Sequence, residues 1–207
     1  ALPLAELAKG KKHVVIISSD HTRPVPSHIT MPILLEEIRK NNPEVRITIL
    51  IATGMHRPTT HEELVNKYGE EIVKNEEIVI HDAYNDNEMT FKGILPSGGE
   101  LWINKLVDEA DLLMSEGFIE PHFFAGFSGG RKSVLPGIAS KKTVLWNHNA
   151  KFIANKNARA GNLENNPIHQ DMLYAAKQAK IQFILNVVIN GEKRIIKAFA
   201  GDLESAH

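Results

Sequence analysis

The sequence predicts an α/β domain with a doubly wound, mostly parallel sheet, similar to a Rossmann fold, and an antiparallel hairpin near its C-terminus. Two short apolar runs, at residues 13–19 and 45–52, are typical of strands that are covered on both faces of a sheet. A segment with helical spacing of apolar residues separates them. This alternation of strands and helices is typical of doubly wound folds.

The first predicted helix begins at Ser27 as its N-cap and ends at the Asn41-Asn42-Pro43 sequence. Its apolar residues at helical spacing are Ile29, Ile33, Leu34 and Ile38. Thr60 and Glu63 have the spacing of a capping box, which predicts a second helix that ends near Tyr68.

Further elements follow the same order along the chain. Residues 78–81 and 112–115 are expected to form strands, and residues 104–110 a helix between them. Asn166 before Pro167 predicts a helix that runs to about residue 180, since proline is tolerated at the first helical position. Asn190-Gly191, between apolar runs at 183–189 and 194–200, predicts a hairpin with a two-residue turn. Residues 155–166 are expected to form a surface loop.

Length and composition limit the possible classes of protein. With 207 residues, 43% of them hydrophobic, the chain predicts one domain with a well-buried core. The 24 Lys and Arg residues nearly balance the 25 Asp and Glu residues, which makes nucleic acid an unexpected partner. No apolar run is long enough to span a membrane, and the first residues do not match the pattern of a signal peptide, so a soluble, cytoplasmic protein is expected. The chain has no cysteine, which excludes disulfides and thiolate ligands.

Ligands of open α/β sheets bind at the carboxyl ends of the strands, where this sequence has unusually polar loops. Asp20 and Arg23 follow the first strand. The planar guanidinium of Arg23 is suited to bind a carboxylate or phosphate, although a simple ion pair with Asp20 explains the same spacing. His56 follows the second strand and His122 the strand at 112–115, which makes these two residues candidates for a general acid and base.

Residues 126–133 are rich in glycine and are expected to lead into a helix, where backbone N–H groups can bind an anion. The segment does not match a P-loop, because Arg131 separates Gly130 from Lys132, and it does not match the dinucleotide fingerprint. Two basic residues at a helix N-terminus oppose the helix dipole, which favours a functional role. His148 lies in a predicted helical segment and is a candidate metal ligand, although such a histidine is more often structural.

Five motifs, in order, resemble the nickel-pincer lactate racemase family and cover most of residues 13–150. They are Asp20-His21-Thr22-Arg23-Pro24, Gly54-Met55-His56-Arg57-Pro58, Glu120-Pro121-His122, Gly129-Gly130-Arg131-Lys132-Ser133 and Trp146-Asn147-His148. The resemblance implies a pyridinium-3,5-bisthiocarboxylic-acid-type mononucleotide, the nickel-pincer nucleotide, whose sulfur-containing arms hold nickel and which is bound covalently to a lysine.

The resemblance also implies roles for individual residues. Lys132 matches the covalent attachment site, and His148 matches the ligand that completes the nickel plane. His56 and His122 match the catalytic acid/base pair, while Arg23 matches the residue that orients the substrate carboxylate. Asp20, Arg23, Gly129, Gly130 and Ser133 are expected to contact the cofactor, with its phosphate near Gly129 and Gly130.

The expected activity is the interconversion of L- and D-lactate. One histidine removes the hydroxyl proton while hydride leaves C2 for the cofactor, and hydride returns to the other face of the resulting pyruvate. Cofactor-synthesis and nickel-insertion proteins are the expected partners. Residues 1–207 are expected to be the cofactor-carrying part of a two-domain enzyme, without its smaller second domain, and to be inactive alone.

Three alternatives remain open at the level of sequence. A related epimerase or racemase with the same cofactor would act on another 2-hydroxy acid. A zinc hydrolase would use His56, His122 and His148 as a three-histidine site, but it leaves Lys132 without a role. A non-catalytic anion-binding module would need only Arg23 and the glycine-rich loop.

Overall fold

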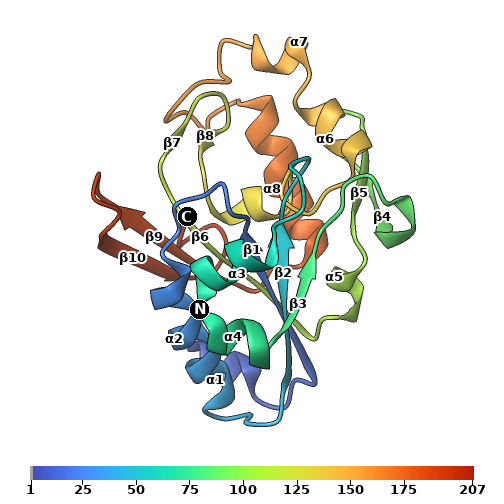
Figure 1. The fold of residues 1–207 in the computed structure, drawn as a ribbon. Coiled ribbons are helices and arrows are strands. Elements are labelled where there is room, and N and C mark those ends of the chain that lie inside the picture. Colours follow the sequence, from blue (N-terminus) through green and yellow to red (C-terminus); the bar gives the residue numbers. More distant parts are fainter. Residues whose placement is uncertain (1) are drawn as a thin grey trace.

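The computed structural model describes residues 2–207 and has at its centre a six-stranded sheet with helices on both faces (Figure 1). The strand order is β10-β9-β6-β1-β2-β3, and all neighbours are parallel except the antiparallel pair β9 and β10. The strands of this sheet are β1 (His13–Ser19), β2 (Arg46–Ala52), β3 (Glu77–Ile80), β6 (Leu112–Phe118), β9 (Phe183–Ile189) and β10 (Ile195–Gly201). The predicted fold class is therefore confirmed.

The order in which strands are added to the sheet reverses between β1 and β6. From β1 the chain adds β2 and then β3 on one side, and it returns to place β6 and β9 on the other side. In doubly wound sheets, such a switch point opens a crevice at the carboxyl ends of the two central strands. The polar loops after β1 and β6 border this crevice.

One face of the sheet is covered by helices from the first part of the chain. Ile16, Ile49 and Met114 point to this face and form a core with α2. The opposite face carries Val15 and Leu113, which pack under α8. The helices are α1 (Leu4–Ala8), α2 (Ser27–Arg39), α3 (His61–Tyr68), α4 (Glu70–Asn75), α5 (Leu106–Glu109), α6 (Lys141–Asn147), α7 (Ala150–Ile153) and α8 (Pro167–Ala179).

Two small hairpins and two short 3₁₀ helices complete the fold. They are the hairpin β4 (Met89–Ile94) with β5 (Glu100–Asn104), the hairpin β7 (Pro121–His122) with β8 (Gly126–Phe127), and the 3₁₀ helices η1 (Asp86–Glu88) and η2 (Gly130–Ser133). No helix among residues 2–207 combines the length and apolar character needed to cross a bilayer.

The capping signals at two predicted helices are confirmed. Thr60 accepts a hydrogen bond from the backbone of Glu63, whose side chain accepts one from the backbone of Thr60, so both halves of the capping box form at α3. Asn166 accepts hydrogen bonds from the first backbone N–H groups of α8, and Pro167 occupies the first turn.

The predicted cap of α2 is wrong. Ser27 is buried and donates its hydroxyl hydrogen bond to Glu116 in β6, not to the backbone of its own helix. The same carboxylate accepts from Thr30 in α2 and Ser18 in β1. Ile29 and Ile33 do not belong to the buried face of the helix as predicted. Both are exposed, whereas Met31 and Leu35 face the core. A long-range carboxylate thus replaces the local cap.

Other boundaries shift because of contacts that are distant in sequence. Asn104 belongs to β5 and not to a helix, since it pairs with Met89 across the β4–β5 hairpin. The turn between β9 and β10 spans residues 190–194 and is longer than two residues, because the Asn190 side chain accepts hydrogen bonds from the backbone of Glu192 and Arg194. The predicted antiparallel hairpin is nevertheless present.

Candidate active site

A cavity of about 340 Å³ lies at the carboxyl ends of β1, β2 and β6. This volume is within the range of small-molecule sites, and its position matches the switch point of the sheet. The cavity is lined by every residue that the sequence singled out as a site candidate, namely Asp20, Arg23, His56, His122, Gly129, Gly130, Lys132, Ser133 and His148. The structure therefore brings these residues together from five separate segments.

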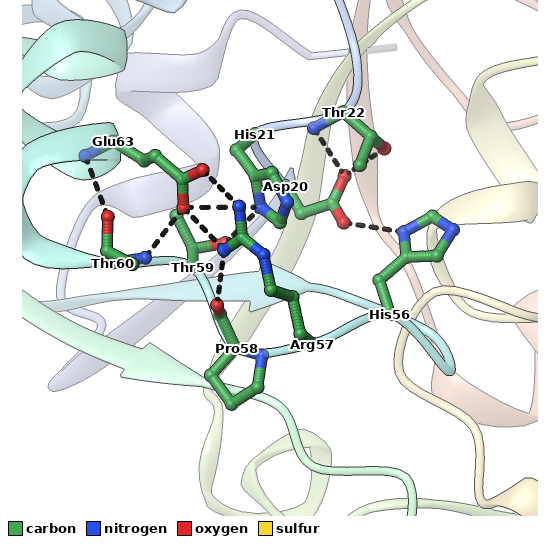
Figure 2. A network of polar contacts seen from close by, with 9 residues as sticks. All are labelled: Asp20, His21, Thr22, His56, Arg57, Pro58, Thr59, Thr60 and Glu63. Atoms are coloured by element: carbon green, nitrogen blue, oxygen red, sulfur yellow. Dashed lines mark hydrogen bonds and ion pairs between the residues drawn. The ribbon is translucent and has the colours of Figure 1, made fainter.

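His56 is held by Asp20 across the ends of β2 and β1 (Figure 2). Its Nδ1 donates to Oδ2 of Asp20 over 2.6 Å, and Asp20 is only 1% exposed. The other carboxylate oxygen accepts from the backbone N–H and the hydroxyl of Thr22. Because the carboxylate accepts at Nδ1, the Nε2 atom of His56 is left free to accept a proton.

Further contacts connect the loop that carries His56 to the start of α3. His21 Nδ1 lies 3.1 Å from the hydroxyl of Thr59, and Arg57 makes a bidentate ion pair with Glu63, the capping-box residue (Figure 2). The hydrogen bond from Arg57 and that from the backbone of Thr60 lower the pKa of the Glu63 carboxyl to about 2. The ion pair and the capping box thus position the segment between His56 and α3.

Arg23 is exposed at the mouth of the cavity and makes no ion pair within residues 2–207. The simple ion pair with Asp20 is therefore not formed, because that carboxylate is already occupied by His56 and Thr22. Only the backbone N–H of Arg23 contacts Asp20, through the carbonyl oxygen at 3.3 Å. The guanidinium remains available for an anionic group.

His122 lies in the β7–β8 hairpin, and its Nδ1 accepts a hydrogen bond of 3.3 Å from the backbone N–H of Ala125. A neutral ring that accepts at Nδ1 carries its proton on Nε2, the reverse of His56. Burial, followed by the positive charges of Lys132 and Arg23, lowers the pKa of His122 to about 3. The two histidines are thus held in opposite tautomers.

Lys132 lines the cavity, and its amine has no hydrogen bond or ion pair with any other residue of 2–207. Burial, then the positive charges of Arg131 and Arg23, lower the pKa of Lys132 to about 7. A large fraction of the amine is therefore neutral near pH 7. A neutral amine is the nucleophilic form of lysine.

Arg131 is the largest fully buried side chain among the described residues, at 1% exposure. Its guanidinium donates to the carbonyl oxygen of Ala125 over 2.7 Å and to Nδ1 of His169 over 2.9 Å, and it lies 2.6 Å from Nε2 of His207. No carboxylate of residues 2–207 lies within ion-pair distance of it. The sequence does not predict this, since two basic residues after two glycines are usually solvated.

The helix expected after the glycine-rich segment is only the four-residue 3₁₀ helix η2. The N–H group of Gly130 is directed to the side chain of Asn186, and the Ser133 hydroxyl donates to the carbonyl oxygen of Gly130. Gly129 and Gly130 both have positive φ, which favours glycine at these positions. The α-helix expected after this segment is therefore not formed, although the glycine-rich loop does line the cavity.

His148 is the C-cap residue of α6 and lines the cavity. Its Nδ1 is buried and has no hydrogen bond of good geometry within residues 2–207. Burial and then the charge of Lys132 lower its pKa to about 4, which the carbonyl of Val144 opposes. The Phe124 ring contacts both His122 and His148 edge-on, with centroid distances of 4.7 and 5.2 Å. A neutral imidazole at this position is suited to bind a metal.

The three histidines do not form a metal cluster by themselves. Among residues 2–207, no group of three or more His, Cys, Asp or Glu side chains is arranged to hold a metal ion. His56 is instead paired with Asp20, and Phe124 lies against both of the others. The geometry gives no support to a three-histidine zinc site.

Among the cavity residues that were not predicted from the sequence are three buried polar residues within strands. Ser115 and Glu116 lie within β6, and Asn186 lies within β9. The available signal is the presence of polar residues in otherwise apolar strands, since such strands are buried on both faces. All three are at most 2% exposed.

Comparison with known proteins shows which family the chain is similar to. The chain is 65% identical over 204 residues to a protein of Lactiplantibacillus plantarum named lactate racemase, and 63% identical over 204 residues to one of the same name from Thermoanaerobacterium thermosaccharolyticum. Each alignment covers 99% of this chain and 48% of the relative. The chain therefore spans about half the length of the curated relatives it matches.

Solved structures give the same result. The lactate racemase apoprotein of Thermoanaerobacterium thermosaccharolyticum superposes with a TM-score of 0.99 at 62% identity, over the whole of this chain and 50% of that chain. A Thermotoga maritima protein has a TM-score of 0.82 at 26% identity, over 98% of this chain and 54% of its own. Residues 1–161 match the family described as the lactate racemase N-terminal domain. The chain belongs to this family.

Proposed function

We propose that the full-length protein is a lactate racemase and that residues 1–207 carry its acid/base pair and its cofactor attachment site. The observation that supports this most directly is the position of His56 and His122, which line one cavity from two separate loops. The two enantiomers of lactate present their hydroxyl groups on opposite sides. A racemase therefore needs two proton-transferring groups around one substrate.

Each histidine has a distinct part in the proposed reaction. Nε2 of His56 accepts the hydroxyl proton of one enantiomer, while the buried Asp20 carboxylate stabilises the charge that forms on the ring. His122 transfers the proton on the other side of the substrate. Arg23 holds the substrate carboxylate at the mouth of the cavity, since its guanidinium is unpaired within residues 2–207.

The residues of the cavity fit the nickel-pincer nucleotide. Lys132 offers an unpaired amine with a pKa of about 7, and His148 offers a largely buried imidazole whose pKa is about 4. The chain has no cysteine, so sulfur ligands for nickel must belong to the cofactor. We infer that Lys132 binds the nucleotide covalently and that His148 binds its nickel. When bound, this group supplies a site that accepts hydride from C2 of the substrate and returns it.

The proposal is tested with the full-length protein, loaded by the cofactor-synthesis and nickel-insertion proteins. We expect conversion of either pure lactate enantiomer to the racemate, measured by chiral chromatography. His56→Ala and His122→Ala are each expected to reduce kcat by roughly 10² or more. Unchanged kcat in both variants would contradict the role of the two histidines, and the absence of racemisation by the loaded wild-type protein would favour a non-catalytic anion-binding module.

Two further measurements separate the remaining alternatives. A panel of 2-hydroxy acids separates a lactate racemase from an epimerase with the same cofactor, because only the latter would prefer a longer or branched acid. Metal analysis with intact mass spectrometry separates nickel and added mass at Lys132 from zinc and an unmodified chain. We also expect residues 1–207 alone to be inactive, and measurable turnover by this segment would contradict that expectation.

A further inference from the structure

Besides Nδ1 of His148, two polar side-chain atoms at the cavity are buried and have no hydrogen-bond partner within residues 2–207. They are Oγ of Ser115 and Nδ2 of Asn186. The two residues are 1% and 0% exposed. Leaving such groups unpaired is unfavourable, and native proteins rarely do so without a reason. Two unpaired groups at one cavity therefore indicate a ligand.

The two side chains lie on the same face of the sheet. β6 and β9 are parallel neighbours, in which Gly117 pairs with Asn186 and Ser115 with Ile184. Side chains alternate along a strand, so Ser115, Gly117 and Asn186 point to the same side as the core residue Leu113. Gly117 has no side chain to fill the space between the two polar residues. Toward the carboxyl ends of β6 and β9, this face therefore carries two polar side chains with no side chain between them, next to the apolar core.

The orientation of the Asn186 amide is determined by the glycine-rich loop. Its Oδ1 accepts from the backbone N–H of Gly130, at 3.4 Å. A Cβ atom on Gly129 would lie 2.9 Å from this oxygen and 2.7 Å from the carbonyl oxygen of Phe118, so only glycine allows the loop to pack this closely. With Oδ1 engaged, the amide offers two N–H donors to a ligand.

The charges around these donors favour an anion. Lys132 lines the same cavity, and the neighbouring Arg131 is a buried cation with no carboxylate partner among the described residues. Two carboxylates also line the cavity, but both are already engaged. Asp20 accepts from His56 and Thr22, and Glu116 accepts three hydroxyl hydrogen bonds. Unpaired donors and the two basic side chains therefore remain at this end, whereas the acceptor atoms of both carboxylates are engaged.

We propose that Ser115 Oγ and Asn186 Nδ2 form an oxyanion subsite at the floor of the cavity, and that it binds the phosphate group of a mononucleotide. The position of the subsite is argued from the unpaired donors. Only the assignment of the bound phosphate to a mononucleotide rests on the proposed function. The other source of an oxyanion is the carboxylate of a 2-hydroxy acid. Phosphate is favoured because Arg23, in a different loop, is available for that carboxylate.

The test measures binding of inorganic phosphate and of L-lactate to the full-length, cofactor-free protein by calorimetry. Asn186→Asp keeps the oxygen that accepts from Gly130 but replaces the free donor with a negatively charged oxygen. We expect it to weaken phosphate binding at least tenfold, and Ser115→Ala to weaken it severalfold. The matched control is Asn155→Asp, which adds the same charge at an exposed asparagine whose Oδ1 also accepts a backbone N–H.

Each outcome decides the proposal. Phosphate binding that is weakened by both cavity variants and not by the control supports it, and the same pattern with lactate alone assigns the subsite to the substrate carboxylate. The absence of saturable binding of either anion overturns the subsite, as does equal binding by Asn186→Asp and wild type. Circular dichroism establishes that the variants fold. Racemase activity is not part of the readout, so a subsite that binds phosphate in a protein without racemase activity would contradict only the proposed function.

Discussion

Nδ1 of His56 lies 2.6 Å from Oδ2 of Asp20, a carboxylate that is almost fully buried although the cavity is beside it. The two residues are 36 positions apart and come from loops after neighbouring parallel strands. Thr22 holds the second carboxylate oxygen, so the carboxylate cannot turn away from the ring without losing these contacts. The pair therefore orients His56 toward its proposed task as a base.

Asp20→Asn is expected to lower kcat of the full-length enzyme by about tenfold or more, with a smaller change in KM. An amide can donate to Nδ1 and so stabilise the tautomer that carries its proton on Nε2. In that tautomer Nε2 has no free lone pair with which to accept the substrate proton. Steady-state kinetics in both directions measure the effect. Asp202→Asn is the control, because Asp202 is exposed and accepts only from nearby residues. A kcat within twofold of wild type would contradict the role of Asp20.

Lys132 is expected to react with acylating reagents at neutral pH much faster than a surface lysine. Its pKa is lowered to about 7 by burial and by the positive charges of Arg131 and Arg23. The other ionisable groups that line the cavity are Asp20, His56, Glu116, His122 and His148. Labelling of cofactor-free protein across a pH series, followed by peptide mass spectrometry, should give a midpoint near pH 7. The exposed Lys142 is the internal reference, and matching profiles for the two lysines would refute the prediction.

His148→Ala is expected to separate nickel binding from covalent attachment. The variant lacks the proposed metal ligand but retains Lys132, so the added mass should remain while the nickel content falls. Lys132→Ala should lose the added mass. Intact mass spectrometry and elemental analysis of protein purified with the maturation proteins measure both quantities. Full nickel occupancy in His148→Ala would exclude this residue as a required ligand.

Acid is expected to destabilise the fold through its buried histidines. Burial lowers the pKa of His81 to about 4, opposed in part by its hydrogen bond to the Ala139 carbonyl. Between pH 6.5 and 4 the unfolded chain binds a proton at this residue and the folded chain does not, so stability is complete above pH 6.5 and falls as the pH decreases. At pH 5 the loss from His81 alone is about 2 kcal/mol.

Urea denaturation at pH 7 and pH 5 measures this loss. The difference in unfolding free energy between pH 7 and pH 5 should be about 2 kcal/mol smaller in His81→Gln than in the wild type. This comparison does not depend on how stable the variant is at pH 7. The remaining difference comes from the other histidines with lowered pKa values, among them His122 and His148. The same difference in wild type and variant would show that His81 is not neutral in the folded protein.

The sequence by itself determined the fold class and nine of the residues that line the cavity. Strands such as β1 and β2 are recognisable because their apolar runs are local patterns, and the capping box of Thr60 and Glu63 is a contact over three residues. Parallel strands end at one edge of the sheet, which explains why reading the residues after each strand found Asp20, His56 and His122.

Only the tertiary structure decided how these residues are paired. Whether Asp20 would bind Arg23 or His56 depended on the approach of two loops, and both pairings fit the sequence. Ser27 matched the pattern of a helix cap, yet its partner Glu116 lies 89 positions away. The burial of Arg131 and the unpaired donors of Ser115 and Asn186 likewise arise from contacts between distant segments. Local patterns specify elements, whereas hydrogen-bond partners and electrostatic environment depend on which elements fold against one another.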